Sequence, residues 1–217
     1  MSLDGLVEAA VGLAPEGGRA VLGIAGVPGV GKSTLAEALV EAVGRRQGAQ
    51  WVAHVPMDGF HLADVQLERL GLLARKGASE TFDVGGYAAT LRRLRSETDR
   101  PVYAPGFERD LEQPIAGAIV VDAQARLVVT EGNYLLLPDP RWREARAALD
   151  QVWLLEADDP VRVERLIARH VQFGKESATA RTWVATVDEV NASLVRAESD
   201  QPDRRVLNTS DGWRFAE

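Results

Sequence analysis

The chain has 217 residues, a length for which one domain is the default, and 46% of them are apolar and 26% charged, as in ordinary globular proteins. Its 25 basic and 32 acidic side chains give a net charge of −7, which argues against nucleic acid or an anionic membrane surface as a partner, because both require a basic face. The absence of cysteine excludes disulfides, thiolate zinc sites and thiol nucleophiles, and it suits a cytoplasmic protein. No apolar run is long enough to predict insertion into a membrane.

The predicted strands and helices alternate along the chain. Residues 3–11 place apolar side chains at helical spacing, which predicts a helix packed on the domain. Apolar and β-branched runs predict strands at residues 20–26, 51–56, 127–131, 151–157 and 204–209. Helical periodicity predicts helices at residues 32–45, 62–75 and 87–97 and in a long region from residue 159, whereas residues 76–87 are turn-rich and predict a loop. A polar turn between residues 118–121 and 127–131 also favours a β-hairpin there.

This alternation predicts an α/β fold in three layers, with a parallel sheet covered by helices on both faces. Ligands of such sheets bind beyond the carboxyl ends of the strands. Three of the predicted strands end close to Gly26, Asp58 and Glu131, and these positions are therefore the first candidates for a functional site.

Residues 26–34 read Gly-Val-Pro-Gly-Val-Gly-Lys-Ser-Thr and match the phosphate-binding pattern G-x-x-x-x-G-K-[ST], between a predicted strand and a predicted helix. Glycines let the backbone turn its N–H groups toward phosphate oxygens, and the helix N-terminus adds positive charge. Lys32 can neutralise the β- and γ-phosphates, and Ser33 offers a hydroxyl to Mg²⁺. The predicted nucleotide-binding residues are Gly26, Val27, Pro28, Gly29, Val30, Gly31, Lys32, Ser33 and Thr34.

Three classes of nucleotide-binding protein compete at this point: a small-molecule kinase, a GTPase-type switch, and an ATPase motor or chaperone. Two segments imitate GTPase motifs. Residues 83–86 spell D-x-x-G without a hydrophobic strand leading into them, and residues 208–211 resemble N-K-x-D without the lysine. The sequence context therefore disfavours the switch.

Asp58 follows the second predicted strand, where a carboxylate could accept the proton of an incoming hydroxyl during phosphoryl transfer. The alternative is a turn role, because Asp-Gly is common turn chemistry. The phosphate-binding pattern upstream favours catalysis. Glu131 ends another strand, where an unpaired buried carboxylate would be uncommon, so a functional role is favoured there too.

Five segments together resemble a known family: GVPGVGKST, MDGFH, RKGASETFD, TEGNYLLL and DDPVRVERLIARH. They are similar to the P-loop kinases that include uridine kinase, phosphoribulokinase and bacterial pantothenate kinase. Within this group, the extended set with YAPGFERDLEQP looks closest to bacterial proteins labelled fructose transport-system kinases or nucleoside/nucleotide kinase-like proteins. The resemblance covers residues 20–209 and implies a single P-loop NTPase domain over residues 1–217, with a five-stranded parallel sheet in the order 2-3-1-4-5, a helical lid at about residues 162–182, and the use of ATP and Mg²⁺.

The resemblance also implies roles for individual residues. Asp58 would be the catalytic base, and Lys32, Arg165 and Arg169 would stabilise the transferring phosphoryl group. Arg162, Arg165 and Arg169 share one helical face, as a lid contributing arginine fingers requires, although a solvated charged face is the alternative. Ser33 and Glu131 would hold Mg²⁺. The residues implied at the acceptor site are Asp58, Phe60, His61, Lys76, Asp83, Tyr103, Arg109, Glu131 and Asn133.

Two departures from the family patterns leave the acceptor open. His61 follows Phe60 where uridine kinases carry an aromatic residue, and the chain lacks the longer N-terminal region of pantothenate kinases. His54 and His61 do not have metal-site spacing, and His54 is interpreted as structural. The sequence therefore predicts a cytoplasmic kinase for a small-molecule acceptor, a sugar, a nucleoside or a pantothenate-like alcohol. A homodimer is compatible with it. The alternative is an ATPase or ATP-binding regulator acting on a protein partner.

Overall fold

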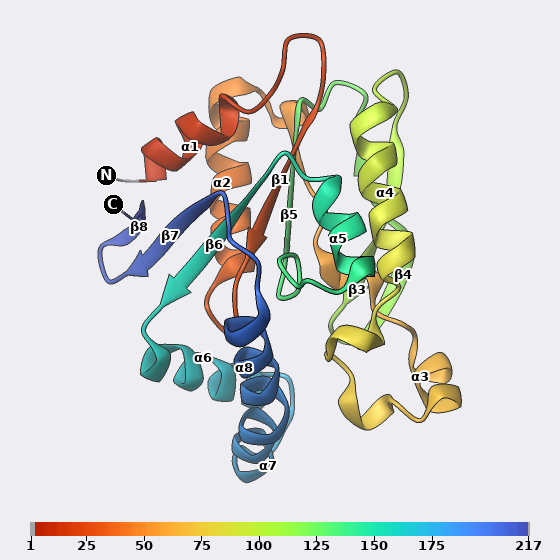
Figure 1. Cartoon of the computed structure of the whole chain (residues 1–217), viewed down its shortest axis with the longest axis vertical. Helices are drawn as coiled ribbons and strands as arrows, with labels where there is room; N and C mark the ends of the chain where they lie inside the picture. The colour runs from red at the N-terminus through yellow and green to blue at the C-terminus, as the bar shows by residue number, and fades with distance from the viewer. Residues whose placement is uncertain (1–2, 217) are drawn as a thin grey trace.

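A six-stranded sheet forms the centre of the molecule in the computed structural model, which describes residues 3–216 (Figure 1). The strand order is β2-β5-β1-β6-β7-β8. The strands are β1 (Ala20–Ala25), β2 (Val52–His54), β5 (Leu127–Gly132), β6 (Gln151–Ala157), β7 (Arg204–Thr209) and β8 (Gly212–Phe215). The first five are parallel and, counted along the chain, run in the order 2-3-1-4-5; β8 pairs antiparallel with β7 and was not predicted.

Burial explains why β1 and β5 occupy the middle of the sheet. All six residues of each strand are buried, as expected for central parallel strands with helices on both faces. Helices α1 (Leu3–Val11) and α2 (Lys32–Gln47) cover one face, and α4 (Val84–Ser96) and α5 (Pro140–Ala147) cover the other. The α/β prediction is confirmed, and so is the packing of the N-terminal helix, whose Leu6, Val7 and Ala10 are buried.

Two predictions for residues 62–131, a long helix and a β-hairpin, were wrong. The helix predicted over residues 62–75 is the shorter α3 (Asp64–Leu70), which ends at Gly71 in the left-handed conformation. The hairpin predicted between residues 118–121 and 127–131 does not form. Instead, β3 (Val102–Glu108) and β4 (Gln113–Val121) make a separate antiparallel ribbon. Both edges of β5 are taken by β1 and β2, so it has no edge left to offer β4.

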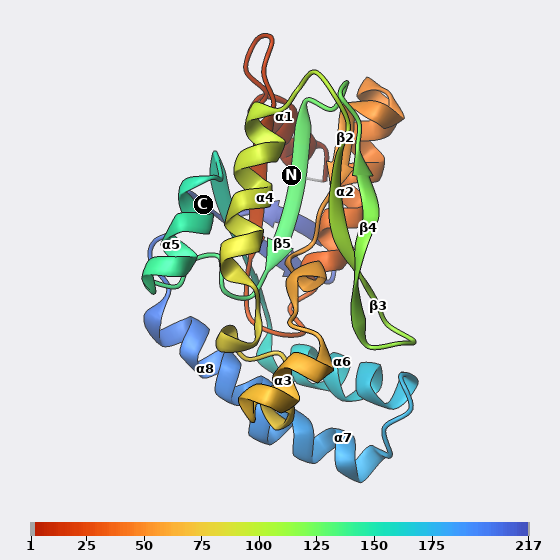
Figure 2. The ribbon, with the colours of Figure 1, turned by 90° about the vertical axis from the view of Figure 1, so that its right-hand side faces the viewer.

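A helical segment lies beyond the carboxyl ends of the parallel strands (Figures 1 and 2). It consists of α6 (Asp159–Gln172), α7 (Ser177–Trp183), a π-helix over Val184–Asp188 and α8 (Glu189–Glu198). Figure 2 shows the β3–β4 ribbon extending toward the same end of the molecule. No helix within residues 3–216 is long and apolar enough to cross a membrane.

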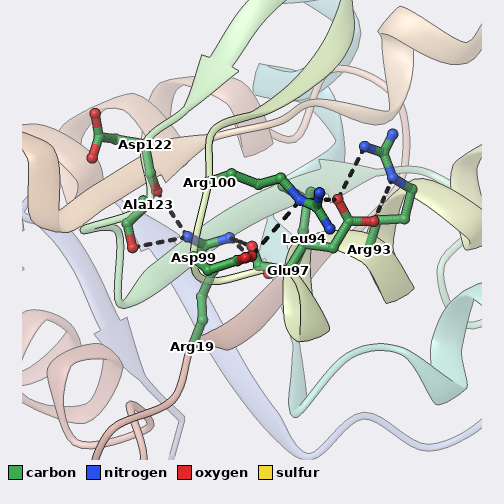
Figure 3. Close-up of polar contacts among 8 residues, drawn as sticks. All are labelled: Arg19, Arg93, Leu94, Glu97, Asp99, Arg100, Asp122 and Ala123. Atoms are coloured by element: carbon green, nitrogen blue, oxygen red, sulfur yellow. Dashed lines mark hydrogen bonds and ion pairs between the residues drawn. The ribbon is translucent and has the colours of Figure 1, made fainter.

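The opposite end of the sheet is fixed by a buried arginine. Arg19 directly precedes β1, is 3% exposed, and donates to the carbonyl oxygens of Leu94 and Asp122, each at 2.8 Å (Figure 3). It also donates to the Ala125 carbonyl oxygen at 2.7 Å. These bonds join the end of α4 to the connection between β4 and β5. Because the guanidinium is satisfied by backbone acceptors, its burial stabilises this end of the fold.

Candidate active site

The phosphate-binding pattern forms the loop between β1 and α2, and it packs directly against α6. Gly29 has φ +77°, and a Cβ built there would lie 2.5 Å from Leu166 Cγ and 3.0 Å from the Arg162 carbonyl oxygen. Both the backbone conformation and the close approach therefore require glycine. The loop is also held from β7, where Asn208 Nδ2 donates to the Val30 carbonyl oxygen at 2.9 Å.

Lys32 is held at the start of α2 by two oxygen acceptors. Its Nζ donates to Asn133 Oδ1 at 2.6 Å and to the Val27 carbonyl oxygen at 3.1 Å. The side chain is almost fully buried, and burial lowers the Lys32 pKa to about 8, against the opposing attraction of Glu131 and Asp58. A lysine held in this way presents a partly desolvated positive charge at the mouth of the loop.

Glu131 ends β5 and accepts a hydrogen bond from Ser33 Oγ at 3.0 Å. Burial, together with the neighbouring negative charge of Asp58, raises the Glu131 pKa to about 7, against the opposing effects of Lys32, Ser33 and Arg109. The hydroxyl and the carboxylate are oxygen ligands of the kind that Mg²⁺ prefers. Because residues 3–216 hold no cluster of three acidic or histidine side chains able to bind a metal, an ion here would need phosphate oxygens and waters as its other ligands.

Asp58 lies in the short 3₁₀ helix Met57–Phe60 after β2, and its Oδ2 is 3.3 Å from Arg109 Nη2. Packing explains why a glycine, Gly59, follows Asp58. A Cβ at Gly59 would lie 2.2 Å from the Pro105 carbonyl oxygen, so the backbone of the β3–β4 ribbon passes where a side chain would be. Gly59 is therefore required because two segments pass close to each other here, and the β3–β4 ribbon brings Arg109 to Asp58.

Two cavities meet at the loop. The first, here named the cradle cavity, has a volume of about 510 Å³ and lies beside residues 26–34. The second, named the carboxylate cavity, has about 360 Å³ and is lined by Asp58 and Glu131. The residues that line both are Gly29, Lys32, Ser33, Arg109, Leu166 and Arg169. Lys32, Arg109 and Arg169 thus surround the junction, where their positive charges would stabilise a negatively charged group that passes from one cavity to the other.

Most of the predicted site residues lie at these cavities. The cradle cavity is lined by Gly29, Gly31, Lys32, Ser33, Thr34, Arg165 and Arg169. The carboxylate cavity is lined by Pro28, Asp58, His61, Lys76, Arg109, Glu131 and Asn133. His61 is fixed by stacking on Phe82, with ring centroids 4.1 Å apart, and by a 2.8 Å contact of Nδ1 with the Asp58 carbonyl oxygen. Burial lowers the His61 pKa, so the neutral ring is favoured.

Three residues predicted at the acceptor site lie elsewhere. Phe60 is 6% exposed and packs in the core against Tyr87. Asp83 caps α4, where its carboxylate accepts from the Gly86 N–H at 2.9 Å. Tyr103 is 63% exposed on β3, because alternate side chains of the ribbon point away from the core. None of the three lines either cavity.

Arg162 differs from the two other arginines of its helix face. It is fully buried and donates to the Pro28 carbonyl oxygen at 3.0 Å, to Asp159 at 2.9 Å and to Glu189 at 2.5 Å. Arg165 and Arg169 are exposed and line cavities. Of the three arginines on this helix face, Arg162 therefore has a structural role, and Arg165 and Arg169 lie at the candidate active site.

Several residues at the cavities were not found by sequence reasoning. Trp213 and Glu37 line the cradle cavity, while Phe173, Trp183, Asp188 and Asn191 line the carboxylate cavity. None of them belongs to a motif. The π-helix between Trp183 and Asn191 is a departure from regular helix that often accompanies functional sites, but no sequence pattern announced it.

Comparison with known proteins decides the family. The chain is 35% identical over 210 residues to the "Putative uridine kinase C227.14" of Schizosaccharomyces pombe, covering 93% of this chain and 88% of that protein. It is 34% identical, with a TM-score of 0.85, to the crystal structure of a "putative fructose transport system kinase" from Silicibacter sp. TM1040, covering 95% and 98% of the two chains. The chain belongs to the P-loop kinase family.

Two partial matches show which part of this P-loop kinase is shared more widely. Over 118 residues it is 36% identical to a pantothenate kinase of Leifsonia xyli, covering 54% of this chain and 36% of that protein. The family model of the methylmalonyl Co-A mutase-associated GTPase MeaB matches residues 7–59, a region centred on the phosphate-binding loop. The two relatives above that match this kinase along most of its length are named as kinases, and its membership supports phosphotransferase activity.

Proposed function

We propose that this kinase transfers the γ-phosphoryl group of Mg·ATP to a hydroxyl group of a small-molecule acceptor. The observation that carries the proposal is the meeting of the two cavities. A loop suited to phosphates lines one cavity, and the carboxylate of Asp58 lines the other. Lys32, Arg109 and Arg169 line both cavities, where these meet. In-line transfer needs a phosphoryl donor, a positioned hydroxyl and cations between them.

The residues beside the loop fit Mg·ATP. The loop opens the helix α2, whose N-terminal N–H groups suit phosphate oxygens, and Lys32 supplies a charge for the β- and γ-phosphates. Ser33 and Glu131 would hold the ion through a hydroxyl and a carboxylate oxygen. When bound, Mg²⁺ supplies charge neutralisation of the phosphate oxygens.

Asp58 is the proposed general base. It accepts the proton of the acceptor hydroxyl as the oxygen–phosphorus bond forms and the bond from the γ-phosphorus to the bridging oxygen breaks. Its partner Arg109, 3.3 Å away, holds the carboxylate in position at the carboxylate cavity. Arg169 reaches the junction from α6 and opposes the negative charge of the transferred group, and Arg165 acts from the cradle cavity.

The acceptor is proposed to be a sugar, a nucleoside or a pantothenate-like alcohol. The full-length relative is named after uridine, the solved structure after a fructose transport system, and the partial match after pantothenate. The carboxylate cavity, at about 360 Å³, has room for a molecule of this size.

Asp58→Asn tests the proposal. It preserves the shape of the side chain and removes the base, so we expect kcat for phosphoryl transfer to fall by about 10²–10⁴ while the Kd for ATP changes little. Transfer can be followed with radiolabelled ATP across a panel of sugars, nucleosides and vitamin precursors. Full transfer by Asp58→Asn would refute the assignment of the base.

The second candidate function is an ATPase or ATP-binding regulator that acts on a protein partner. The two differ in what ATP consumption requires. A kinase remains nearly idle until its acceptor is added, whereas an ATPase hydrolyses ATP in the absence of any small molecule. The lining of the carboxylate cavity by polar side chains on several elements favours the kinase, because an ATPase needs no second cavity beside its nucleotide.

A further inference from the structure

We infer that Asn191 and Asp188 of the helical segment bind hydroxyl groups of the acceptor, so that the acceptor is a polyol of the sugar type. The inference rests on the proposed kinase function. It adds the chemistry of the acceptor at the wall of the carboxylate cavity that α8 and the π-helix contribute.

Asn191 is an unusual buried side chain. It is 7% exposed and lines the carboxylate cavity from α8. Within residues 3–216 its amide forms no hydrogen bond, and it is not among the unpartnered polar atoms that are sealed from the surface. Its polar atoms therefore face the cavity. The side chain is held by its buried surroundings while no group in the described part of the chain occupies its amide, so a ligand that enters the cavity can hydrogen-bond to it.

The amide alone admits several ligands, because it offers one acceptor oxygen and two N–H donors. A hydroxyl, a carboxylate or the edge of a nucleobase could each bind to it. The choice among them depends on the charges and acceptors that surround Asn191 in the cavity.

Asp188 narrows the choice to groups that donate. It lies three residues before Asn191 and also lines the cavity. Its Oδ2 contacts His170 Nε2 at 2.8 Å, and Oδ1 has no recorded partner among the described residues. A carboxylate oxygen accepts hydrogen bonds only, and it repels the carboxylate of an acid. A hydroxyl can donate to Asp188 and accept from Asn191, which a carboxylate cannot do; the N–H and C=O groups of a nucleobase edge could do the same, and the experiment below separates the two.

The π-helix and the first turn of α8 carry these two residues to the cavity. The cavity is lined by Trp183 before the π-helix, by Val187 and Asp188 within it, and by Asn191 after it. The neighbouring Lys175 lies 5.0 Å from the centre of the Trp183 ring. An apolar ring beside paired polar side chains suits a sugar, which presents C–H groups and hydroxyls on different faces.

The test compares Asn191→Leu with wild-type enzyme and with Ser193→Ala, an exposed position on the same helix. Leucine keeps the volume and removes the hydrogen bonds. For a sugar acceptor found in the panel, we expect KM to rise about 10–100-fold with Asn191→Leu, while KM for ATP changes less than about threefold. D-Ribose and 2-deoxy-D-ribose, and D-fructose with its deoxy analogues, show whether the loss is specific to one hydroxyl. Wild type should prefer the sugar over one deoxy analogue, and Asn191→Leu should not.

A second readout does not depend on activity. If Asn191 is kept for a ligand, no protein group depends on its amide, so Asn191→Leu should leave the Tm of the ligand-free protein within about 2 °C of the wild-type value or raise it. A larger fall in Tm would mean that Asn191 is structural, and it would overturn the inference. Ser193→Ala should leave Tm and both KM values unchanged.

The outcomes separate the inference from the proposed function. Equal use of monohydroxy alcohols and sugars, or a preference for a hydroxy acid or a free nucleobase edge, would overturn the polyol assignment. Transfer sensitive to Asp58→Asn would still support the kinase in those cases. Hydrolysis of ATP at full rate without any acceptor would refute the kinase itself and the inference with it.

Discussion

The cradle cavity and the carboxylate cavity are built in different ways. The cradle cavity is built around one continuous stretch, residues 26–34, whose shape is imposed by glycine and a helix N-terminus, and α6, the β3–β4 ribbon, β7 and β8 add side chains to its wall. The carboxylate cavity is assembled from the ends of β2 and β5, the turn-rich loop after α3, the tip of the β3–β4 ribbon and three parts of the helical segment. A contiguous site can be recognised from a motif, whereas an assembled site depends on how distant segments approach one another.

The largest expected effect concerns the residue that belongs to both cavities. Arg169→Ala should lower kcat by about 10²–10³, because a cation at the junction opposes charge that develops in the transition state. The Kd for ATP should change less than tenfold. Arg165, which lines only the cradle cavity, is the matched control, and Arg165→Ala should act more on ATP binding. Steady-state kinetics and isothermal titration with a non-hydrolysable ATP analogue measure both; equal losses in kcat and affinity for Arg169→Ala would place that residue with the nucleotide alone.

The next effect tests how the two cavities are held together. Arg162→Ala leaves Asp159, Glu189 and the Pro28 carbonyl oxygen without their buried partner, and removal of one member of a buried ion pair costs about 3–5 kcal/mol. Urea denaturation measures the loss of unfolding free energy. Arg165→Ala, at an exposed position on the same helix, should change it by less than about 0.5 kcal/mol. A small loss for Arg162→Ala would mean that loop and helices are stable without each other.

The smallest expected effect is a pH dependence of the unfolding free energy that is caused by His54. His54 is half-buried in β2, its Nε2 is sealed from the surface without a hydrogen-bond partner, and burial lowers its pKa to about 4. Between that value and the ordinary value of 6.5, the unfolded chain binds the proton more tightly, so stability is lost as pH falls from about 6.5 to 4. His54→Gln should reduce the slope of unfolding free energy against pH in this range by up to about 1.4 kcal/mol per pH unit. Urea titrations at several pH values measure it, and an unchanged slope would contradict the assignment.

The same contrast explains what the sequence could predict. The loop at residues 26–34 and the α/β architecture were predictable, because periodicity and a contiguous motif carry them. Asp58 and Glu131 were found because each follows an apolar strand. Tyr103 and Phe60 were misplaced because a motif gives the position of a residue along the chain and leaves open the side to which it points.

Asn191 and Trp213 were missed for another reason. They reach the cavities only because α8 and β8 fold back toward the loop, across more than half of the chain. Asp83 has a local role as the N-cap of α4. Its place just before a predicted helix could have indicated this role, because aspartate is a favoured N-cap residue. Local chemistry is thus readable in the sequence, and long-range approach is not.

Arg162 has a consequence for movement of the helical segment. It joins the phosphate-binding loop to the first turn of α6 through Asp159 and to the first turn of α8 through Glu189. A swing of the whole segment as one rigid body would keep the bonds to Asp159 and Glu189, but it would break the bond to the Pro28 carbonyl oxygen and separate Leu166 from Gly29. A pivot farther along α6 would avoid both losses, and the moving part would then be its outer end with α7. Arg169 would move with that part, while the first turns of α6 and α8 would stay joined to the phosphate-binding loop through Arg162.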